Sequence, residues 1–153
     1  MELIFTKRKD GKYDHLAIWN AGELRGEIEC PKQGIIPHDM VHYGVEHILQ
    51  KRGFIGRVAA GEAAVFQMQG EAESNGVERL VEVFQADGWA GWSTAAEDML
   101  DLYQVTCAAR QCPALPLQVA DVEQVRQELL RLSALWQTTE PGQSLHLEFT
   151  SRD

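Results

Sequence analysis

The chain has 153 residues, of which 44% are hydrophobic and 24% are charged, and its 14 basic and 23 acidic residues give a formal net charge of −9. These proportions are typical of a globular domain and argue against a disordered, collagen-like or coiled-coil chain. The length favours a single domain over residues 1–153, which would bury about 68–70% of the surface that the unfolded chain exposes.

The sequence lacks the patterns of a membrane or secreted protein. No stretch approaches the roughly 18 consecutive apolar residues that a membrane-spanning helix needs. Residues 3–5 are apolar and a basic run follows them, which is the wrong order for a signal peptide. The cysteines Cys30, Cys107 and Cys112 are odd in number and unevenly spaced, unlike a disulfide framework. We therefore expect a cytoplasmic protein with free thiols and no membrane partner.

The negative charge is concentrated in the second part of the chain. Residues 1–60 carry nine basic and eight acidic residues, whereas residues 61–153 carry five and fifteen. Nucleic-acid binding depends on cationic contacts with phosphate groups, so we expect no nucleic-acid partner. The charge identifies neither a small-molecule substrate nor a protein partner, and it leaves the oligomeric state open.

Three β-rich runs open the chain, over residues 2–8, 13–20 and 24–30. Asp10-Gly11 lies between the first two, and Asp-Gly in such a position is a strong hairpin signal. Residues 145–149 alternate between apolar and polar side chains and predict a final strand that could join the same sheet. The predicted fold class is therefore α+β, with a small antiparallel sheet made from the N-terminal meander plus a C-terminal strand, packed against four to five helices.

Helical periodicity dominates the middle of the chain. Pro37 suits a first helical position because its φ is restricted, and the apolar spacing after it predicts a helix over residues 37–51. Asn75-Gly76 is expected to precede a helix, and Thr94 with Glu97 is expected to form a capping box. Further helices are predicted over 77–87, from Thr94 to about 110, and from the cap Asp121 to about 138. Residues 53–61 form a glycine-bearing segment, with a short helix near 62–69 as an option after it. Residues 88–92 are predicted to form a loop.

The helix over 37–51 carries the densest group of candidate metal ligands. At about 100° per residue, His38, Asp39, His42 and Glu46 share one edge of the helix. His38-Asp-x-x-His42 resembles the zinc-binding His-Glu-x-x-His motif, whose two histidines hold the ion while the carboxylate acts as a general base. Asp39 is one methylene shorter than the glutamate of that motif, which shortens its reach toward a metal-bound water.

Distance restricts which of these residues share one ion. Eight residues of helix separate His38 from Glu46 by about 12 Å, so one ion cannot take both directly. The ligand pair is either His38 with His42 or His42 with Glu46, and both pairs stay open at this point. Asp39 and Glu46 are the candidate catalytic carboxylates. The cofactor expected here is one divalent ion, with zinc preferred.

A further ligand would come from another part of the chain. His15, Glu62 and the cysteines are the candidates. A site of three cysteines and one histidine would need Cys30 to approach Cys107 and Cys112, and buried, inert thiols are the alternative.

The first part of the chain resembles a group of small uncharacterised bacterial proteins. They share an N-terminal hairpin, a Pro-His-Asp-hydrophobic-x-His-Tyr-x-Val-Glu helix and a Gly-Phe-x-Gly-x-x-Ala-x-Gly segment. The resemblance covers residues 1–62 and implies no particular activity. The residues that carry it are His38, Asp39, His42, Tyr43, Glu46, Gly53, Phe54, Gly56, Ala59 and Gly61.

Three functional hypotheses follow. The first is a small metal-dependent hydrolase, with the ion held on the helix over 37–51 and Asp39 orienting a histidine or acting as base. The alternative is a non-catalytic protein-interaction module, in which that helix is a scaffold and the acidic helices or the sheet edge bind a partner. The third is a metal-free acid–base site in which Asp39 tunes His42.

Two features also have purely structural interpretations. His42 and Glu46 could form a surface pair one helical turn apart, and Asp39 in the first turn favours the helix dipole. Trp89 and Trp92 lie on a predicted glycine-bearing loop, where they either line a ligand pocket or close over the core.

Overall fold

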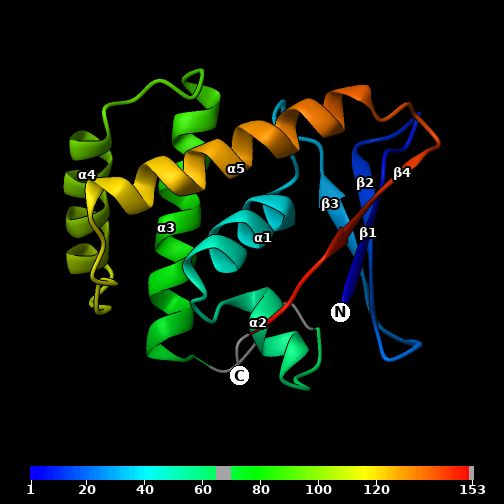
Figure 1. Cartoon of the computed structure of the whole chain (residues 1–153), viewed down its shortest axis with the longest axis horizontal. Coiled ribbons are helices and arrows are strands. Elements are labelled where there is room, and N and C mark those ends of the chain that lie inside the picture. The colour runs from blue at the N-terminus through cyan, green and yellow to red at the C-terminus, as the bar shows by residue number, and fades with distance from the viewer. Residues whose placement is uncertain (65–69, 152–153) are drawn as a thin grey trace.

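The computed structural model describes residues 1–64 and 70–151. Within these residues the chain forms four strands and five helices (Figure 1). Their order is β1 (Glu2–Thr6), β2 (Tyr13–Asn20), β3 (Glu23–Pro31), α1 (His38–Leu49), α2 (Phe54–Ala59), α3 (Ala72–Trp89), α4 (Ala96–Ala109), α5 (Val119–Thr138) and β4 (Ser144–Glu148). The predicted α+β fold class is confirmed.

The strands form one antiparallel sheet in the order β3-β2-β1-β4. Leu3 and Phe5 of β1 lie opposite Ile18 and Leu16 of β2, and all four side chains are fully buried. Alternate residues of a strand point to opposite faces, so these four residues mark the face of the sheet that borders the core. The predicted meander and the predicted C-terminal strand beside it are both confirmed.

The helices cover one side of the sheet, and α4 lies farthest from it (Figure 1). Helix α1 contacts α2, α3 and α5 and therefore occupies the centre of the helical layer. The hydroxyl of Tyr43 on α1 donates a hydrogen bond to the backbone oxygen of Glu148, 2.9 Å away. This bond connects the central helix with the edge strand β4.

Helix α3 is longer than predicted at both ends. It begins at Ala72, so Asn75 and Gly76 lie inside the helix and do not precede it. A Cβ at Gly76 would lie 3.1 Å from the backbone oxygen of Pro113, and the glycine thus allows a close approach of the chain after α4. The helix continues to Trp89, so the predicted loop over residues 88–92 is wrong for its first two residues.

The predicted caps of the last two helices are also corrected. The capping box of Thr94 with Glu97 is wrong, because the N-cap of α4 makes no side-chain hydrogen bond. The backbone N–H of Thr94 donates instead to the Asp87 carboxylate on α3. Asp121 is the third residue of α5 rather than its cap, and it accepts a hydrogen bond from the backbone N–H of the N-cap, Gln118.

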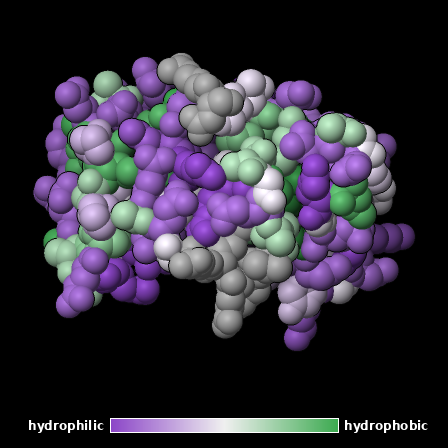
Figure 2. All heavy atoms as spheres, turned by 90° about the horizontal axis from the view of Figure 1, so that it is seen from below, coloured by the Kyte–Doolittle hydropathy of each residue, from purple (hydrophilic) through white to green (hydrophobic). Residues whose placement is uncertain are grey.

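The glycine-bearing segment predicted over residues 53–61 contains α2. Residues 62–64 form no helix, and residues 65–69 of the optional short helix lie outside the described residues. Among the described residues, no helix is long and apolar enough to span a membrane. The face seen in Figure 2 is largely hydrophilic, and its hydrophobic side chains form small separate patches. Such patches are common on the surfaces of monomeric proteins.

Replacing Tyr103 with phenylalanine is expected to lower the free energy of unfolding by about 1–3 kcal/mol. The fully buried Tyr103 hydroxyl donates to the backbone oxygen of Gly76 and accepts from the backbone N–H of Leu115. Phenylalanine leaves both backbone groups without this partner. Urea denaturation of Y103F measures the loss, and Y13F is the matched control because Tyr13 is 45% exposed. Equal effects of the two substitutions would contradict the prediction.

Candidate metal centre

The candidate centre lies where the first turns of α1 face α3. His38 and His42 are four residues apart on α1, so their rings lie on one side of the helix with centroids 5.0 Å apart. Glu78 of α3 contacts both rings. Its Oε1 lies 3.2 Å from Nε2 of His38, and its Oε2 lies 2.6 Å from Nε2 of His42. One ligand atom from each of these three residues lies within 4.8 Å of the others.

These three residues, which we call the metal triad, are a suitable donor set for a divalent ion. Catalytic zinc sites commonly use three protein ligands, including the combination of two histidines and one glutamate, and keep a further position for water or substrate. In the hydrogen bond between His42 and Glu78, the carboxylate accepts the proton that Nε2 of His42 carries. An ion held at this position would take the place of that proton and of the hydrogen bond.

Glu46 contacts His42 from the side opposite Glu78. Its Oε2 lies 3.0 Å from Nδ1 of His42, and its side chain is fully buried. The carboxylate also accepts hydrogen bonds from the backbone N–H groups of Gly53, Ile55 and Gly56, at distances of 2.7–3.1 Å. These N–H groups belong to the start of α2, where a negative charge is favourable. Glu46 therefore joins α1 to α2 through one buried anion.

The contact with Glu46 orients the imidazole of His42. A carboxylate that accepts the Nδ1 proton directs Nε2 toward the metal position, an arrangement typical of histidines that bind metals. Burial lowers the pKa of His42, but its hydrogen bonds with Glu46 and Glu78 have the larger combined effect and raise the pKa to about 10. Burial raises the pKa of Glu78, but hydrogen bonds with His38 and His42 bring it well below its usual range.

Asp39 lies beside the metal triad without joining it. It lines the same cavity, and its Oδ2 lies 3.8 Å from the thiol sulfur of Cys30, which donates to it. Burial raises the pKa of Asp39, and this effect outweighs the opposing influence of His42 and His38. Burial is also the main reason that the pKa of the Cys30 thiol is raised. The carboxylate of Asp39 thus faces the cavity while its neighbour thiol stays protonated.

The metal triad includes two of the three predicted ligands. His38 and His42 come together as the helical spacing requires, but Glu46 is not part of the group. Both oxygens of Glu46 already accept hydrogen bonds, from His42 and from the start of α2. Its position is that of a residue that orients His42, and Glu78 supplies the third atom of the candidate group.

None of the candidates for a further ligand lies in the metal triad. His15 pairs with Glu27 on the sheet at 3.3 Å, and Glu62 binds Arg57 through two hydrogen bonds. The cysteines are free, and within the part of the chain that the structure describes none of them joins a metal-ligating group. Local sequence patterns could not select Glu78, because α3 also carries other acidic residues. Only the packing of α3 against α1 distinguishes it.

The metal triad opens onto a cavity of about 790 Å³. This volume is in the range of about 300–1,000 Å³ that is typical of small-molecule sites. Phe54, Arg57 and Asn75 also line the cavity. Arg57 is buried, and its guanidinium is held by the carboxylate of Glu62. The metal triad therefore lies at the wall of a cavity whose volume suits a small molecule.

Comparisons with models of protein families, with curated proteins and with solved structures each found no match for the chain. An α+β fold class supports many unrelated activities. The geometry of the metal triad and its cavity is therefore the basis for inferring a function.

Replacing Glu46 with glutamine is expected to lower the free energy of unfolding by about 3–5 kcal/mol, the range for removing one partner of a buried charged pair. Glutamine keeps the shape of the side chain. Its NH₂ group, however, would face N–H groups that in the unmodified chain donate to a carboxylate oxygen. Urea denaturation followed by circular dichroism measures the change. E123Q on the exposed face of α5 is the control, with an expected effect within about 0.5 kcal/mol. A comparably small effect of E46Q would contradict the prediction.

The ion pair beside the cavity predicts a pH-dependent stability. The hydrogen bonds from Arg57 are the main reason that the pKa of Glu62 is lowered. A lowered pKa means that Glu62 stabilises the fold above its ordinary pKa of about 4.5, and that the contribution is lost as the pH falls through the lower folded-state value. E62Q is therefore expected to be less stable than the unmodified chain at pH 7, and the difference should shrink below about pH 4.5. Urea denaturation at several pH values measures it, and a difference independent of pH would contradict the prediction.

Proposed function

We propose that the protein is a metal-dependent hydrolase of small molecules, in which His38, His42 and Glu78 hold one divalent ion and Asp39 acts as the general base. Zinc is the preferred ion, because two histidines and one glutamate form a common catalytic zinc set. The observation that carries the proposal is the convergence of the three ligand atoms within 4.8 Å at the wall of a cavity of about 790 Å³.

The role of Asp39 follows from its place in the helix and in the cavity. It directly follows His38, as the catalytic glutamate follows the first histidine in the His-Glu-x-x-His motif. Its carboxylate lines the cavity without contributing to the metal triad. A divalent ion held by His38, His42 and Glu78 would supply a Lewis acid for the activation of water. The carboxylate of Asp39, which lines the same cavity, would accept the proton from the attacking water.

Glu46 acts as a positioning residue in this proposal. It holds Nδ1 of His42 while Nε2 faces Glu78. Because the Glu46 carboxylate is itself held by three backbone N–H groups, it cannot turn away without breaking those bonds. The imidazole orientation therefore does not depend on the ion, which lowers the entropy lost when an ion binds.

Metal content tests the ligand assignment directly. Protein purified without a histidine tag or chelator is expected to contain about one zinc ion per chain, measured by elemental analysis. The variants E78Q and H38Q should lose the metal, and both should fold because these two side chains are about one-third exposed. E82Q, one helical turn beyond Glu78 on α3, is the matched control and should keep it.

Two results of this measurement would contradict the proposal. One is a protein that contains no metal and does not bind zinc or manganese at micromolar concentrations. The other is iron as the only bound metal, because two histidines and one carboxylate with iron are typical of oxygenases rather than hydrolases.

The variant D39N separates the general base from the metal site. It should keep the metal of the unmodified protein but hydrolyse chromogenic esters, amides and phosphate esters about 10²–10⁴ times more slowly, which is the usual contribution of a general base. D98N, in the first turn of α4, is the control and should keep full activity. Full activity of D39N with any substrate that the protein hydrolyses would exclude Asp39 as the base.

One observation favours the alternative of a non-catalytic interaction module. The hydrogen bonds of His42 with Glu46 and Glu78 satisfy both ring nitrogens without any ion. In this alternative the metal triad is a polar network that stabilises the packing of α1 against α3. The protein then binds no metal, and E78Q changes its stability without changing a metal content.

A further inference from the structure

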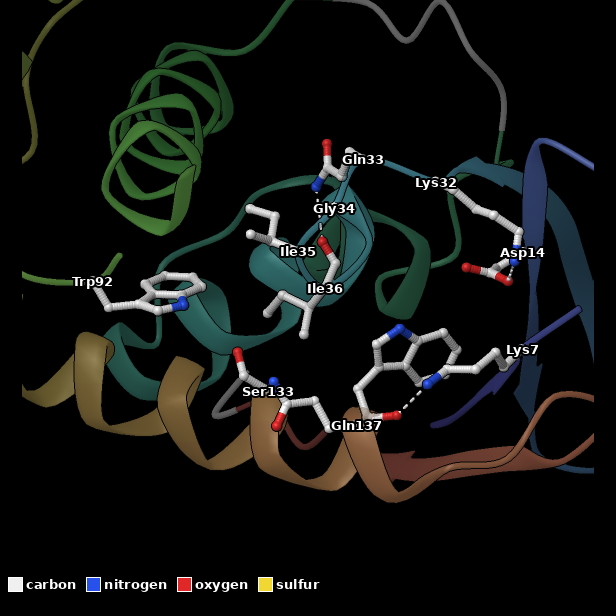
Figure 3. A pocket seen from close by; sticks show the side chains of 11 residues that line it. Lys7, Asp14, Lys32, Gln33, Gly34, Ile35, Ile36, Trp92, Ser133 and Gln137 are labelled. Carbon is white, nitrogen blue, oxygen red and sulfur yellow. Dashed lines mark hydrogen bonds and ion pairs between the residues drawn. The ribbon is translucent and has the colours of Figure 1, made fainter. Parts of the chain in front are cut away.

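A second cavity, of about 370 Å³, is lined by the connection between β3 and α1, by α5 and by the loop after α3. Figure 3 shows Trp92 at one end of this cavity and Lys7 and Lys32 at the other, with Ile35 and Ile36 between them. His38, His42 and Glu78 do not line it. Its chemistry can therefore be considered independently of the metal triad.

The charged residues of the second cavity give it a positive balance in an acidic protein. Lys7 and Lys32 line it together with one acidic residue, Asp14. Nζ of Lys32 donates to Asp14 at 2.8 Å and to the backbone oxygen of Arg8 at 2.7 Å. Nζ of Lys7 donates to the backbone oxygen of Trp136 and lies 4.7 Å from the centre of its ring. Each ammonium group has three N–H donors, so these bonds leave donors for a ligand.

A buried carboxylate positions one of the two ammonium groups. Asp14 is 5% exposed and lies on the core face of β2, where Leu16 and Ile18 are its neighbours at alternate positions. It accepts hydrogen bonds from the backbone N–H of Arg8 and from Lys32. A buried carboxylate among apolar residues needs such partners. Asp14 therefore holds the ammonium of Lys32 at the wall of the cavity.

The opposite end of the cavity is formed by a tryptophan in a rare backbone conformation. Trp92 has a φ of 61°, which is uncommon for a bulky residue and is found mainly where the surrounding structure enforces it. Its backbone N–H donates to the backbone oxygen of Asp87 at 2.8 Å. A Cβ at Gly88 would lie 2.8 Å from the indole ring and 2.9 Å from Ile35. The glycine thus leaves the space in which the indole packs beside the cavity.

From these contacts we infer that the second cavity binds a small aromatic carboxylate. The ammonium groups of Lys7 and Lys32 would bind the carboxylate, since charge-assisted hydrogen bonds of this kind are strong. Trp92 and Ile35, which are partly exposed and line the cavity, offer apolar surface for the flat ring. The volume lies near the lower end of the range for small-molecule sites and suits one or two fused rings. This inference goes beyond the proposed hydrolase activity and does not depend on it.

The test uses 2-naphthoate as the probe and 2-naphthamide as its uncharged counterpart, both measured by isothermal titration calorimetry with the full chain. Naphthoate is expected to bind at least ten times more tightly than the amide. K7M and K32M should each weaken naphthoate binding about tenfold or more, which is the value of a charge-assisted hydrogen bond. K12M, on the exposed turn between β1 and β2, is the matched control and should bind like the unmodified chain.

A variant that fills the cavity keeps the test decisive if a lysine variant fails to fold. Ser133 lines the cavity from α5, so S133F should abolish naphthoate binding while the metal content stays that of the unmodified chain. Absence of naphthoate binding at millimolar concentration, equal binding of the amide, or unchanged binding by S133F would each overturn the inference. Loss of metal in E78Q with normal naphthoate binding would separate this site from the metal triad.

Discussion

The arrangement of α1, α2 and the metal triad depends on the hydrogen bonds that the buried carboxylate of Glu46 accepts. A fully buried anion is unfavourable unless hydrogen bonds compensate for its lost hydration. Here the start of α2 supplies backbone N–H groups, and His42 supplies a ring nitrogen. Gly53 makes this approach possible, because a Cβ there would lie 2.8 Å from the carboxylate. The packing of α1 against α2 and the orientation of the His42 ring therefore both depend on the same buried charge.

Local sequence patterns predicted the elements well, because the alternation of β2 and the spacing of His38 and His42 depend only on nearby residues. They failed where distant residues decide the outcome. Asn75-Gly76 has the local pattern of a turn, yet it lies inside α3, where the glycine faces Tyr103 and the chain after α4. Local patterns also could not predict the contacts of Glu78 with His38 and His42, because these contacts form only when α3 packs against α1.

The two cavities share one structural element, the connection between β3 and α1. Gln33 lines both cavities, and its side chain donates to the backbone oxygen of Ile36 and accepts from Gln85 of α3. The backbone oxygen of Gln33 also accepts a hydrogen bond from the indole of Trp89. These bonds attach the segment between β3 and α1 to α3. His38 directly follows this segment at the start of α1. The segment between the two cavities thus also supports His38, the first residue of the metal triad.

The position of β4 beside β1 has a consequence for how the chain folds. The hydroxyl groups of Thr6 and Ser144 lie 2.7 Å apart although 138 positions separate them in sequence. Closing so long a loop costs conformational entropy, and contacts of this kind slow folding. The meander of β1, β2 and β3 can form early from local contacts, but one edge of β1 stays unpaired until residues 144–148 arrive. Pairing with β4 is therefore expected to be a late step, and until it occurs the free edge of β1 is open to association with other chains.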